Sequence, residues 1–211
     1  MLKYFIYLLA LLIIICGAVG AFHLYRVGQK NKAEMAQFTD QVQYQNNLGR
    51  VLVVYYSLSG QTKKIAEFIA AQTKADIYEI TVAEPYTSPS VYAKSKKELD
   101  SKQYPQLAAE LPDLSAYDVI FVGGPVWWYT MATPLFSFLE KADFAGKKVV
   151  PFSTQGSNYG KFFTDFTAMA QNADIQKSEN FNNLKPEYDD MVHNKINTWL
   201  NNLAETVTTD E

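Results

Sequence analysis

The sequence predicts an α/β domain with one open, doubly wound parallel sheet of five strands, preceded by a single transmembrane helix. Three observations support this prediction. Short β-branched runs alternate along the chain with segments of helical spacing, which is the pattern of a parallel sheet covered by helices. The clearest run, VLVVYY at residues 51–56, is continuously apolar, as expected for a strand covered on both faces. Ahead of these elements, residues 4–22 form an apolar segment without a charge.

The apolar segment from Tyr4 to Phe22 is long enough to cross a bilayer. At about 1.5 Å per residue, its 19 residues extend roughly 28 Å. A cleaved signal peptide is the alternative, because Lys3 gives a basic start and small residues lie near the end. A lipoprotein signal ending at Cys16 fits less well, because the bulky Ile15 precedes the cysteine. We favour an uncleaved anchor, since the run exceeds the roughly 7–15 residues of a usual signal-peptide core.

Basic residues are distributed unevenly around this segment. Lys3 alone precedes it, whereas Arg26, Lys30 and Lys32 follow it closely. Because Lys and Arg are enriched in cytoplasmic loops, this distribution indicates that the rest of the chain lies on the cytoplasmic face. A short basic head before an apolar run is also typical of export signals, which would place the domain on the other side.

The chain divides into four predicted parts. These are a transmembrane anchor or signal peptide at residues 1–25, a polar linker at 26–48, a globular domain at 49–206 and a tail at 207–211. The linker is dominated by Gln, Asn and Lys, which distinguishes it from the domain that follows.

The strands and helices of the domain can be placed in chain order. Strands are predicted at residues 51–56, 77–82, 119–122 and 148–153, and a fifth is signalled only by Ile175 and Phe181. Helices are predicted at residues 62–72, 91–99 and 134–141, followed by a last helix with an apolar stripe from Val192 to Leu203. Pro151 has no amide hydrogen, so we expect an irregularity in the fourth strand. The charged run from Lys94 to Glu98 is expected to be a solvated helix face.

Composition excludes several classes of protein. The 211 residues are 48% hydrophobic and 19% charged, unlike a disordered, collagenous or coiled-coil chain. The first 48 residues carry four basic and two acidic residues, so the body from Gly49 onward has a net charge near −5. An acidic body without a basic stripe argues against nucleic acid as a partner. Cys16 is the only cysteine, so any redox chemistry must come from a bound cofactor rather than from a disulfide.

A turn rich in hydroxyl groups follows the first predicted strand and opens directly into a helix. Ser57 to Thr62, SLSGQT, would combine free amides at a helix N-terminus with several hydroxyls, which together make a phosphate cradle. No lysine directly follows Gly60, as a nucleotide triphosphatase loop would require, and no GxGxxG motif is present, so ATP and a Rossmann-type dinucleotide are disfavoured. A monophosphate held without a metal fits better. The alternative is an ordinary strand-to-helix turn in which Ser and Thr cap the helix.

Two further loops follow the third and fourth strands. The third strand ends in GGPVWWY, residues 123–129, where paired glycines permit close backbone approach and three aromatic residues can form a stacking wall. The alternative is that these aromatic side chains fill the core. The fourth strand ends in STQGSNYG, residues 153–160. Because successive parallel strands end at the same edge of a sheet, we expect the three loops to converge on one crevice.

The segments YYSLSGQT, GGPVWWYTMATP and PFSTQGSNYG resemble the flavodoxin-like fold, in particular its flavodoxin-domain family with a GxPxWW motif. The resemblance covers about Arg50 to Leu203. It implies a strand order of 2-1-3-4-5 and FMN as the cofactor. One departure is Gln155, which stands where relatives often have a small residue, and Gly156 alone replaces the usual double glycine.

The resemblance also implies which residues bind FMN. The first loop would hold the phosphate through Ser57, Leu58, Ser59, Gly60, Gln61 and Thr62. The second loop would border the isoalloxazine ring through Gly124, Pro125, Val126, Trp127 and Trp128. The third loop would contribute Ser153, Thr154, Gly156 and Ser157. No catalytic side chain and no metal ligand is expected.

The function that follows is electron transfer by a membrane-tethered FMN protein. FMN would carry the chemistry, and the partner would be a redox protein or a small-molecule acceptor. The chain would act either as a shuttle or as a small reductase that takes hydride from NAD(P)H. The alternative is a non-enzymatic flavodoxin-like module that binds another ligand or a protein, because a fold alone does not fix a function.

Overall fold

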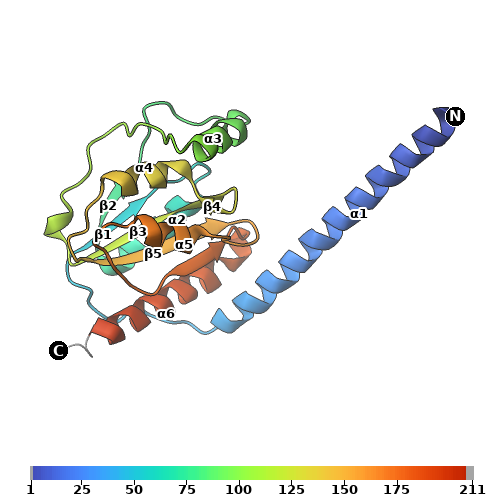
Figure 1. The fold of residues 1–211 in the computed structure, drawn as a ribbon. Helices are drawn as coiled ribbons and strands as arrows, with labels where there is room; N and C mark the ends of the chain where they lie inside the picture. Colours follow the sequence, from blue (N-terminus) through green and yellow to red (C-terminus); the bar gives the residue numbers. More distant parts are fainter. Residues whose placement is uncertain (1, 208–211) are drawn as a thin grey trace.

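A computed structural model describes residues 2–207 of the chain (Figure 1). Residues 208–211 of the predicted tail lie outside the described residues. The described part comprises a three-layered α/β domain and a long helix, α1 (Leu2–Met35), which projects from one end of the domain.

The middle layer is a parallel sheet with strand order β2-β1-β3-β5-β6. These strands are β1 (Val51–Tyr55), β2 (Asp76–Glu79), β3 (Val119–Trp127), β5 (Lys148–Gln155) and β6 (Asp174–Ile175). A two-residue strand, β4 (Thr130–Met131), pairs antiparallel with the end of β3. When this hairpin strand is left out of the count, the predicted order 2-1-3-4-5 is confirmed.

The edge of the sheet beside β5 is built from two short strands instead of one. β6 pairs with Lys148 and Val149, and β7 (Glu179–Asn182) pairs with residues 152–155. Val149 O accepts a hydrogen bond from Gln176 N at 2.8 Å, so Pro151, two residues on, faces the same edge without an amide hydrogen to donate. β5 itself runs unbroken against β3. The irregularity expected at Pro151 therefore falls on the neighbouring strand.

Helices cover both faces of the sheet, as a doubly wound fold requires. α2 (Gln61–Thr73) and α6 (Asp189–Val207) pack on one face, and α3 (Ser90–Ser101), α4 (Thr133–Lys141) and α5 (Phe162–Met169) lie on the other. Val51, Val53 and Tyr55 face α2 and α6, whereas Leu52 and Val54 face the opposite layer. This two-sided burial explains why the run in β1 is continuously apolar.

Helix α5 was not predicted, although Phe162 and Phe166 are fully buried and lie four residues apart on one face of it. Short 3-10 helices occur at Ala36–Phe38, Leu114–Ala116 and Pro186–Tyr188.

Helix α1 is long and apolar enough to cross a membrane by length and composition, and one such helix occurs in the described part of the chain. Its apolar window is not buried against the domain. A signal sequence near an N-terminus has the same properties, so the helix is compatible with either an anchor or a signal. The helix does not stop at the predicted boundary near residue 25, but continues to Met35.

The second half of the predicted linker runs along α6 as an extended strap, residues 39–48 (Figure 1). Asn194, Asn197 and Asn201 lie on one face of α6 because they are three or four residues apart. Val42 N donates to Asn194 Oδ1 at 3.1 Å, and Asn197 Nδ2 donates to Val42 O at 2.7 Å. Asn201 accepts from the amide of Gln45 at 3.1 Å. Side-chain amides offer both donors and acceptors, so they satisfy an extended backbone as a neighbouring strand would.

Candidate functional site

The first loop connects β1 to α2 through a tight turn. Ser57 Oγ accepts a hydrogen bond from Gly60 N at 3.1 Å, and Gly60 adopts a φ of +85°, which glycine tolerates best. Gly60 supplies no side-chain cap to α2. The first intrahelical bond runs from Lys64 N to Gly60 O, so the amides of the preceding turn have no intrahelical partner. The start of α2 can therefore donate to an anion.

A buried hydroxyl pair joins the first loop to the third. Thr62 Oγ1 and Thr154 Oγ1 lie 2.7 Å apart, and both side chains are almost fully buried. One hydroxyl donates to the other, so the accepting hydroxyl keeps its own hydrogen for a further acceptor. Thr62 thus fixes the distance between α2 and the end of β5.

The second loop is a β-hairpin whose turn consists of two aromatic residues. Trp127 pairs with Thr130, and between them Trp128 and Tyr129 adopt φ values of +52° and +62°. Positive φ at both central residues is the geometry of a type I′ turn, which usually contains Asn and Gly. Aromatic residues in this conformation each carry strain of about 1–2 kcal/mol.

Contacts from two other elements hold this turn in place. Trp128 Nε1 donates to Ser95 Oγ on α3 at 3.0 Å, and Tyr129 O accepts from Lys161 N at 2.7 Å. Gly160 lies against Tyr129, where an added Cβ would stand 2.2 Å from the carbonyl oxygen. The third loop therefore supports the second.

The three consecutive aromatic residues do not share one environment. Trp127 is half-buried and makes edge-on contacts with Tyr56 and Tyr86, with ring centroids 5.6 and 5.1 Å apart. Trp128 is 45% exposed and Tyr129 is 68% exposed. The interpretation that all three fill the core therefore does not hold.

A buried acid bonds to Tyr86, whose ring contacts Trp127, contrary to expectation. Glu98 was expected on a solvated face, but it is 9% exposed, and it shares the inner face of α3 with Val91 and Ser95. Its Oε2 accepts hydrogen bonds from the Tyr86 hydroxyl at 2.5 Å and from Thr133 Oγ1 at 2.7 Å. Burial raises the pKa of the Tyr86 phenol, and the bond to Glu98 raises it further, so Tyr86 remains a donor. The spacing of Val91, Ser95 and Glu98 was the sequence signal for this face.

The third loop depends on the residue that departs from the family pattern. Gln155 Oε1 accepts from Ser153 Oγ at 3.0 Å, and Gln155 Nε2 donates to Asn180 Oδ1 at 2.8 Å. Gln155 is 3% exposed, so a polar side chain is satisfied here inside the protein. Gly156 has open space where a Cβ would stand.

These loops enclose a cavity of about 530 Å³ at the carboxyl ends of β1, β3 and β5. The cavity brings together nine predicted residues, which are Leu58, Ser59, Pro125, Val126, Trp127, Trp128, Thr154, Gly156 and Ser157. Sequence reasoning missed the contribution of α3, which adds Val91, Tyr92 and Ser95. Gln155, Asn158 and Asn183 also line the cavity.

Six predicted residues are absent from the lining. Ser57, Gly60, Gln61 and Thr62 build the turn and the start of α2. Ser153 is fully buried, with its hydroxyl bonded to Gln155. Leu135 fills the space beside Gly124, 2.5 Å from the position of an added Cβ. The close approach that Gly124 permits is therefore to a core side chain.

The donors and surfaces of the cavity fit FMN. None of its lining residues carries a formal charge. The uncapped start of α2 and the hydroxyls nearby suit a phosphate, and the aromatic side chains opposite suit a flat ring. The volume lies within the usual range for small-molecule sites, about 300–1,000 Å³. Among the described residues, no group of three or more His, Cys, Asp or Glu could hold a metal ion.

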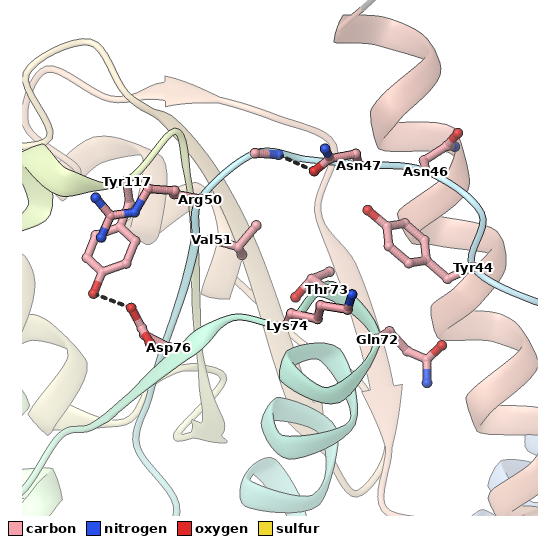
Figure 2. A pocket seen from close by; sticks show the side chains of 11 residues that line it. Tyr44, Asn46, Asn47, Arg50, Val51, Gln72, Thr73, Lys74, Asp76 and Tyr117 are labelled. Carbon is pink, nitrogen blue, oxygen red and sulfur yellow. Dashed lines mark hydrogen bonds between the residues drawn. The ribbon is translucent and has the colours of Figure 1, made fainter.

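A second hollow, of about 490 Å³, lies at the opposite end of the sheet (Figure 2). Its lining includes Arg50, Lys74 and Asp76. The Tyr117 hydroxyl donates to Asp76 Oδ2 at 2.9 Å, and the Arg50 guanidinium lies 5.5 Å from the centre of the Tyr117 ring. Arg50 and Asp76 therefore both interact with Tyr117.

Comparison with curated proteins gives two kinds of relative. Flavodoxin 1 of Escherichia coli (strain K12) is 30% identical over 118 residues, which are 54% of this chain and 54% of that protein. An NAD(P)H dehydrogenase (quinone) of Cupriavidus metallidurans is 30% identical over 96 residues, or 45% of this chain and 47% of that protein. The chain spans about half the length of the curated relatives it matches.

Solved structures match over more of the chain. A candidate flavoprotein from Bacteroides eggerthii has a TM-score of 0.61 at 29% identity, covering 74% of this chain and 98% of that one. A flavoprotein from Lactobacillus acidophilus NCFM in complex with FMN has a TM-score of 0.57 at 26% identity, covering 63% of this chain and 93% of that one. The family described as Flavodoxin matches residues 50–203. The chain therefore belongs to the flavodoxin family.

Proposed function

We propose that this protein binds FMN in the cavity at the carboxyl ends of the strands and transfers electrons while tethered to a membrane by α1. The observation that carries the proposal is the convergence of three loops on one uncharged cavity, with an uncapped helix start at one side and aromatic side chains at the other. The flavoprotein from Lactobacillus acidophilus, which holds FMN, supports the cofactor.

The phosphate would be held at the start of α2. The amides of Gln61 and Thr62 have no intrahelical partner, and Ser59 lines the cavity beside them. The pair of Thr62 and Thr154 keeps one hydroxyl hydrogen available for a phosphate oxygen. Because a helix N-terminus carries a partial positive charge, this arrangement binds a dianion without a basic side chain.

The ring would lie between Leu58 of the first loop and the Trp127–Trp128 segment of the second. When bound, FMN supplies the one- and two-electron chemistry of its isoalloxazine ring. The role of the protein is to stack on the ring, to exclude water and to set the local charge. Glu98 bonds to Tyr86 and Thr133, and the Tyr86 ring contacts Trp127, so this cluster supports an aromatic side chain that lines the cavity.

Two modes of action are compatible with this site. The likeness to a flavodoxin favours a shuttle that passes electrons to a redox partner protein. The likeness to an NAD(P)H dehydrogenase (quinone) favours a reductase that takes hydride from NAD(P)H and reduces a small-molecule acceptor. Oxidation of NADPH in step with reduction of an added quinone would identify the reductase.

We propose that α1 is an uncleaved anchor and that the domain lies on the cytoplasmic face. The helix passes without a break from the apolar span into the turns that contact the domain, so a cleavage near residue 21 would cut a continuous helix. Arg26, Lys30 and Lys32 follow the span, in agreement with the preference of basic residues for the cytoplasmic side.

The test of the cofactor is optical. The full-length chain is purified in detergent, and its visible absorption is recorded before and after addition of FMN and removal of the excess. We expect a yellow protein with about one FMN per chain, because the three loops converge on one cavity. A chain that stays colourless after addition of FMN would overturn the proposal and favour the non-enzymatic module.

A further inference from the structure

Exposed apolar side chains of the domain are concentrated around the mouth of the cavity. Among the described residues outside α1, the exposed large apolar side chains are Leu58, Ile77, Tyr92, Trp128, Tyr129 and Tyr159. Four of these line the cavity, and Tyr159 follows Asn158, which also lines it. Four of the side chains at the mouth are aromatic, and with Leu58 they form what we call the aromatic rim, namely Leu58, Tyr92, Trp128, Tyr129 and Tyr159. Only Ile77, on the edge strand β2, lies apart from it.

Helix α1 is fixed to the domain by an ion cluster around a buried lysine. Lys195 Nζ on α6 lies 2.7 Å from Glu34 Oε1 and 3.1 Å from Glu179 Oε1, and it donates to Asn180 O at 2.6 Å. The Lys195 side chain is 5% exposed. A buried cation that loses one of its carboxylates is left poorly compensated, so this cluster resists opening. We call Glu34, Glu179 and Lys195 the anchor clamp.

The anchor clamp lies at the same end of the sheet as the cavity. Asn182, at the end of β7, donates to Glu34 Oε2 and accepts from Gln155 Nε2, both at 3.4 Å. Gln155 lines the cavity, so one residue separates α1 from the site. Figure 1 shows α1 leaving the domain at this end and extending to the side on which α3 and β4 lie.

The turns of α1 between the apolar span and the clamp suit a membrane surface. They rise about 18 Å from Phe22 to Glu34 at 1.5 Å per residue. Arg26, Lys30 and Lys32 lie in these turns, and residues 23–33 contain no acidic side chain. Such a segment is attracted to anionic lipid headgroups.

We propose that the aromatic rim docks on the headgroup region of the membrane that α1 spans, so that the cavity opens toward the bilayer. The inference rests on the membrane tether of the proposed function. Tyr and Trp combine an apolar body with a polar tip, and they are the side chains enriched at membrane interfaces. The anchor clamp, the basic turns of α1 and the aromatic rim all occur at this end of the molecule. An electron acceptor would therefore reach the cavity from the plane of the membrane.

The test measures how close the rim comes to lipid. In a Cys16→Ser background, Tyr92→Cys on the rim is labelled with an environment-sensitive fluorophore, and Ser115→Cys, exposed before β3 at the other end of the sheet, is the matched control. Each full-length chain is reconstituted in vesicles of phosphatidylcholine and phosphatidylglycerol, with or without a lipid that carries a nitroxide quencher. We expect the nitroxide lipid to lower the emission at position 92 and to leave the emission at position 115 unchanged.

Each other outcome overturns the proposal in a recognisable way. Equal emission at both positions in chains that float with the vesicles would overturn rim docking and leave the tether intact. Failure of the chain to float with vesicles would overturn the tether itself, while the FMN absorbance of the same sample reports separately on the cofactor. A label at position 92 that is shielded from iodide in water but not quenched by the lipid would show a second copy or another protein on the rim.

The contribution of the anchor clamp is tested with a pair of conservative variants. Glu34→Gln removes one carboxylate from Lys195 and leaves Glu179 in place. Asp40→Asn makes the same change at an exposed position of the strap, so it controls for net charge. We expect the lipid quenching at position 92 to fall in Glu34→Gln and to persist in Asp40→Asn. Undiminished quenching in Glu34→Gln would overturn the orientation assigned to the clamp.

Discussion

The two ends of the sheet carry hollows of similar volume but of different chemistry. At the carboxyl end, a cavity of about 530 Å³ is lined by uncharged side chains and lies beside a helix start without a side-chain cap. At the amino end, a hollow of about 490 Å³ is lined by the charged residues Arg50, Lys74 and Asp76, and the Asp76 carboxylate accepts a hydrogen bond from Tyr117. The two hollows therefore differ in the charge of their lining and in the helix start beside one of them, and volume alone does not separate the two ends.

In the turns at the amino end, polar side chains form hydrogen bonds with nearby groups. Asp113 Oδ1 accepts from Ser115 N at 3.0 Å, and Asp143 Oδ1 accepts from Ala145 N at 3.0 Å and from Asn172 Nδ2 at 2.9 Å. These hydrogen bonds hold the pKa of both carboxyl groups below the ordinary value of Asp. Local side-chain bonds of this kind stabilise a turn and leave little for a ligand.

The largest expected effect comes from a glycine at each end of the sheet. Gly160→Ala at the carboxyl end places a Cβ 2.2 Å from Tyr129 O at a φ of +55°, whereas Gly146→Ala at the amino end has a φ of +82° and meets nothing within 4 Å. We expect Gly160→Ala to lower the free energy of unfolding by about 3 kcal/mol and Gly146→Ala by about 1 kcal/mol. Urea titrations followed by circular dichroism measure both. Equal losses of unfolding free energy in the two variants would mean that the turn at Trp128 and Tyr129 moves to accommodate the added Cβ without cost.

The two ends of α2 offer a matched pair of threonines. Thr62 lies at its start beside the cavity, and Thr73 lies at its end, where its hydroxyl donates to Ile69 O at 2.8 Å. We expect Thr62→Val to weaken FMN binding by roughly 1–3 kcal/mol, because a hydroxyl of the phosphate cradle is lost. Thr73→Val should leave FMN affinity unchanged. Calorimetric titration with FMN measures both affinities. Equal FMN affinities of the two variants would mean that the Thr62 hydroxyl is not part of the phosphate cradle.

Two tryptophans, one at the cavity and one in the core, test where the isoalloxazine ring binds. Trp128 lines the cavity, whereas Trp199 is buried between α6 and the sheet, where its ring contacts Phe121 at 5.5 Å. An indole ring near the isoalloxazine ring quenches its fluorescence by donating an electron, which a phenyl ring does far less readily. We expect Trp128→Phe to raise the emission of bound FMN and Trp199→Phe to leave it unaltered. No change in Trp128→Phe would place the ring away from Trp128.

The smallest expected effect is a pH dependence at the amino end. The folded pKa of Asp113 is lowered, so its contribution to stability is present above the unfolded pKa and is lost as pH falls through the folded pKa. Asp113→Asn should therefore be less stable than the unmodified chain at neutral pH, and the gap should narrow in acid. Thermal melts of both chains across this pH range measure it. A gap independent of pH would mean that the carboxylate has no special role in the turn.

Much of the fold could be predicted because its signals are local. The continuous apolar run in β1 and the stripe on α6 predict buried elements directly, and Ile175 and Phe181, the only signals of the predicted fifth strand, lie in β6 and β7. The split of the edge strand could not be predicted, since it depends on which side of β5 Pro151 faces. The strap could not be predicted either, because the residues of α6 that bond to it are about 150 residues away in sequence.

The loops of the candidate site could be predicted, but the buried polar side chains that support them could not. Polar residues at strand ends indicated where the cavity forms, and nine of the predicted residues line it. The sequence could not show that Gln155 is buried and bonds to Asn180, because β7 is not adjacent to it in the chain. Glu98 was misplaced because charged neighbours hid its helical spacing to Ser95 and Val91.

The central claim is that FMN binds at the carboxyl end of the sheet and not at the amino end. The most direct test is a titration of the isotope-labelled full-length chain with FMN, followed by the backbone amide resonances. The account predicts large shifts for Gln61, Thr62 and Gly156, and unchanged resonances for Gly49 and Ser115. Shifts confined to Gly49, Ser115 and their neighbours would contradict it.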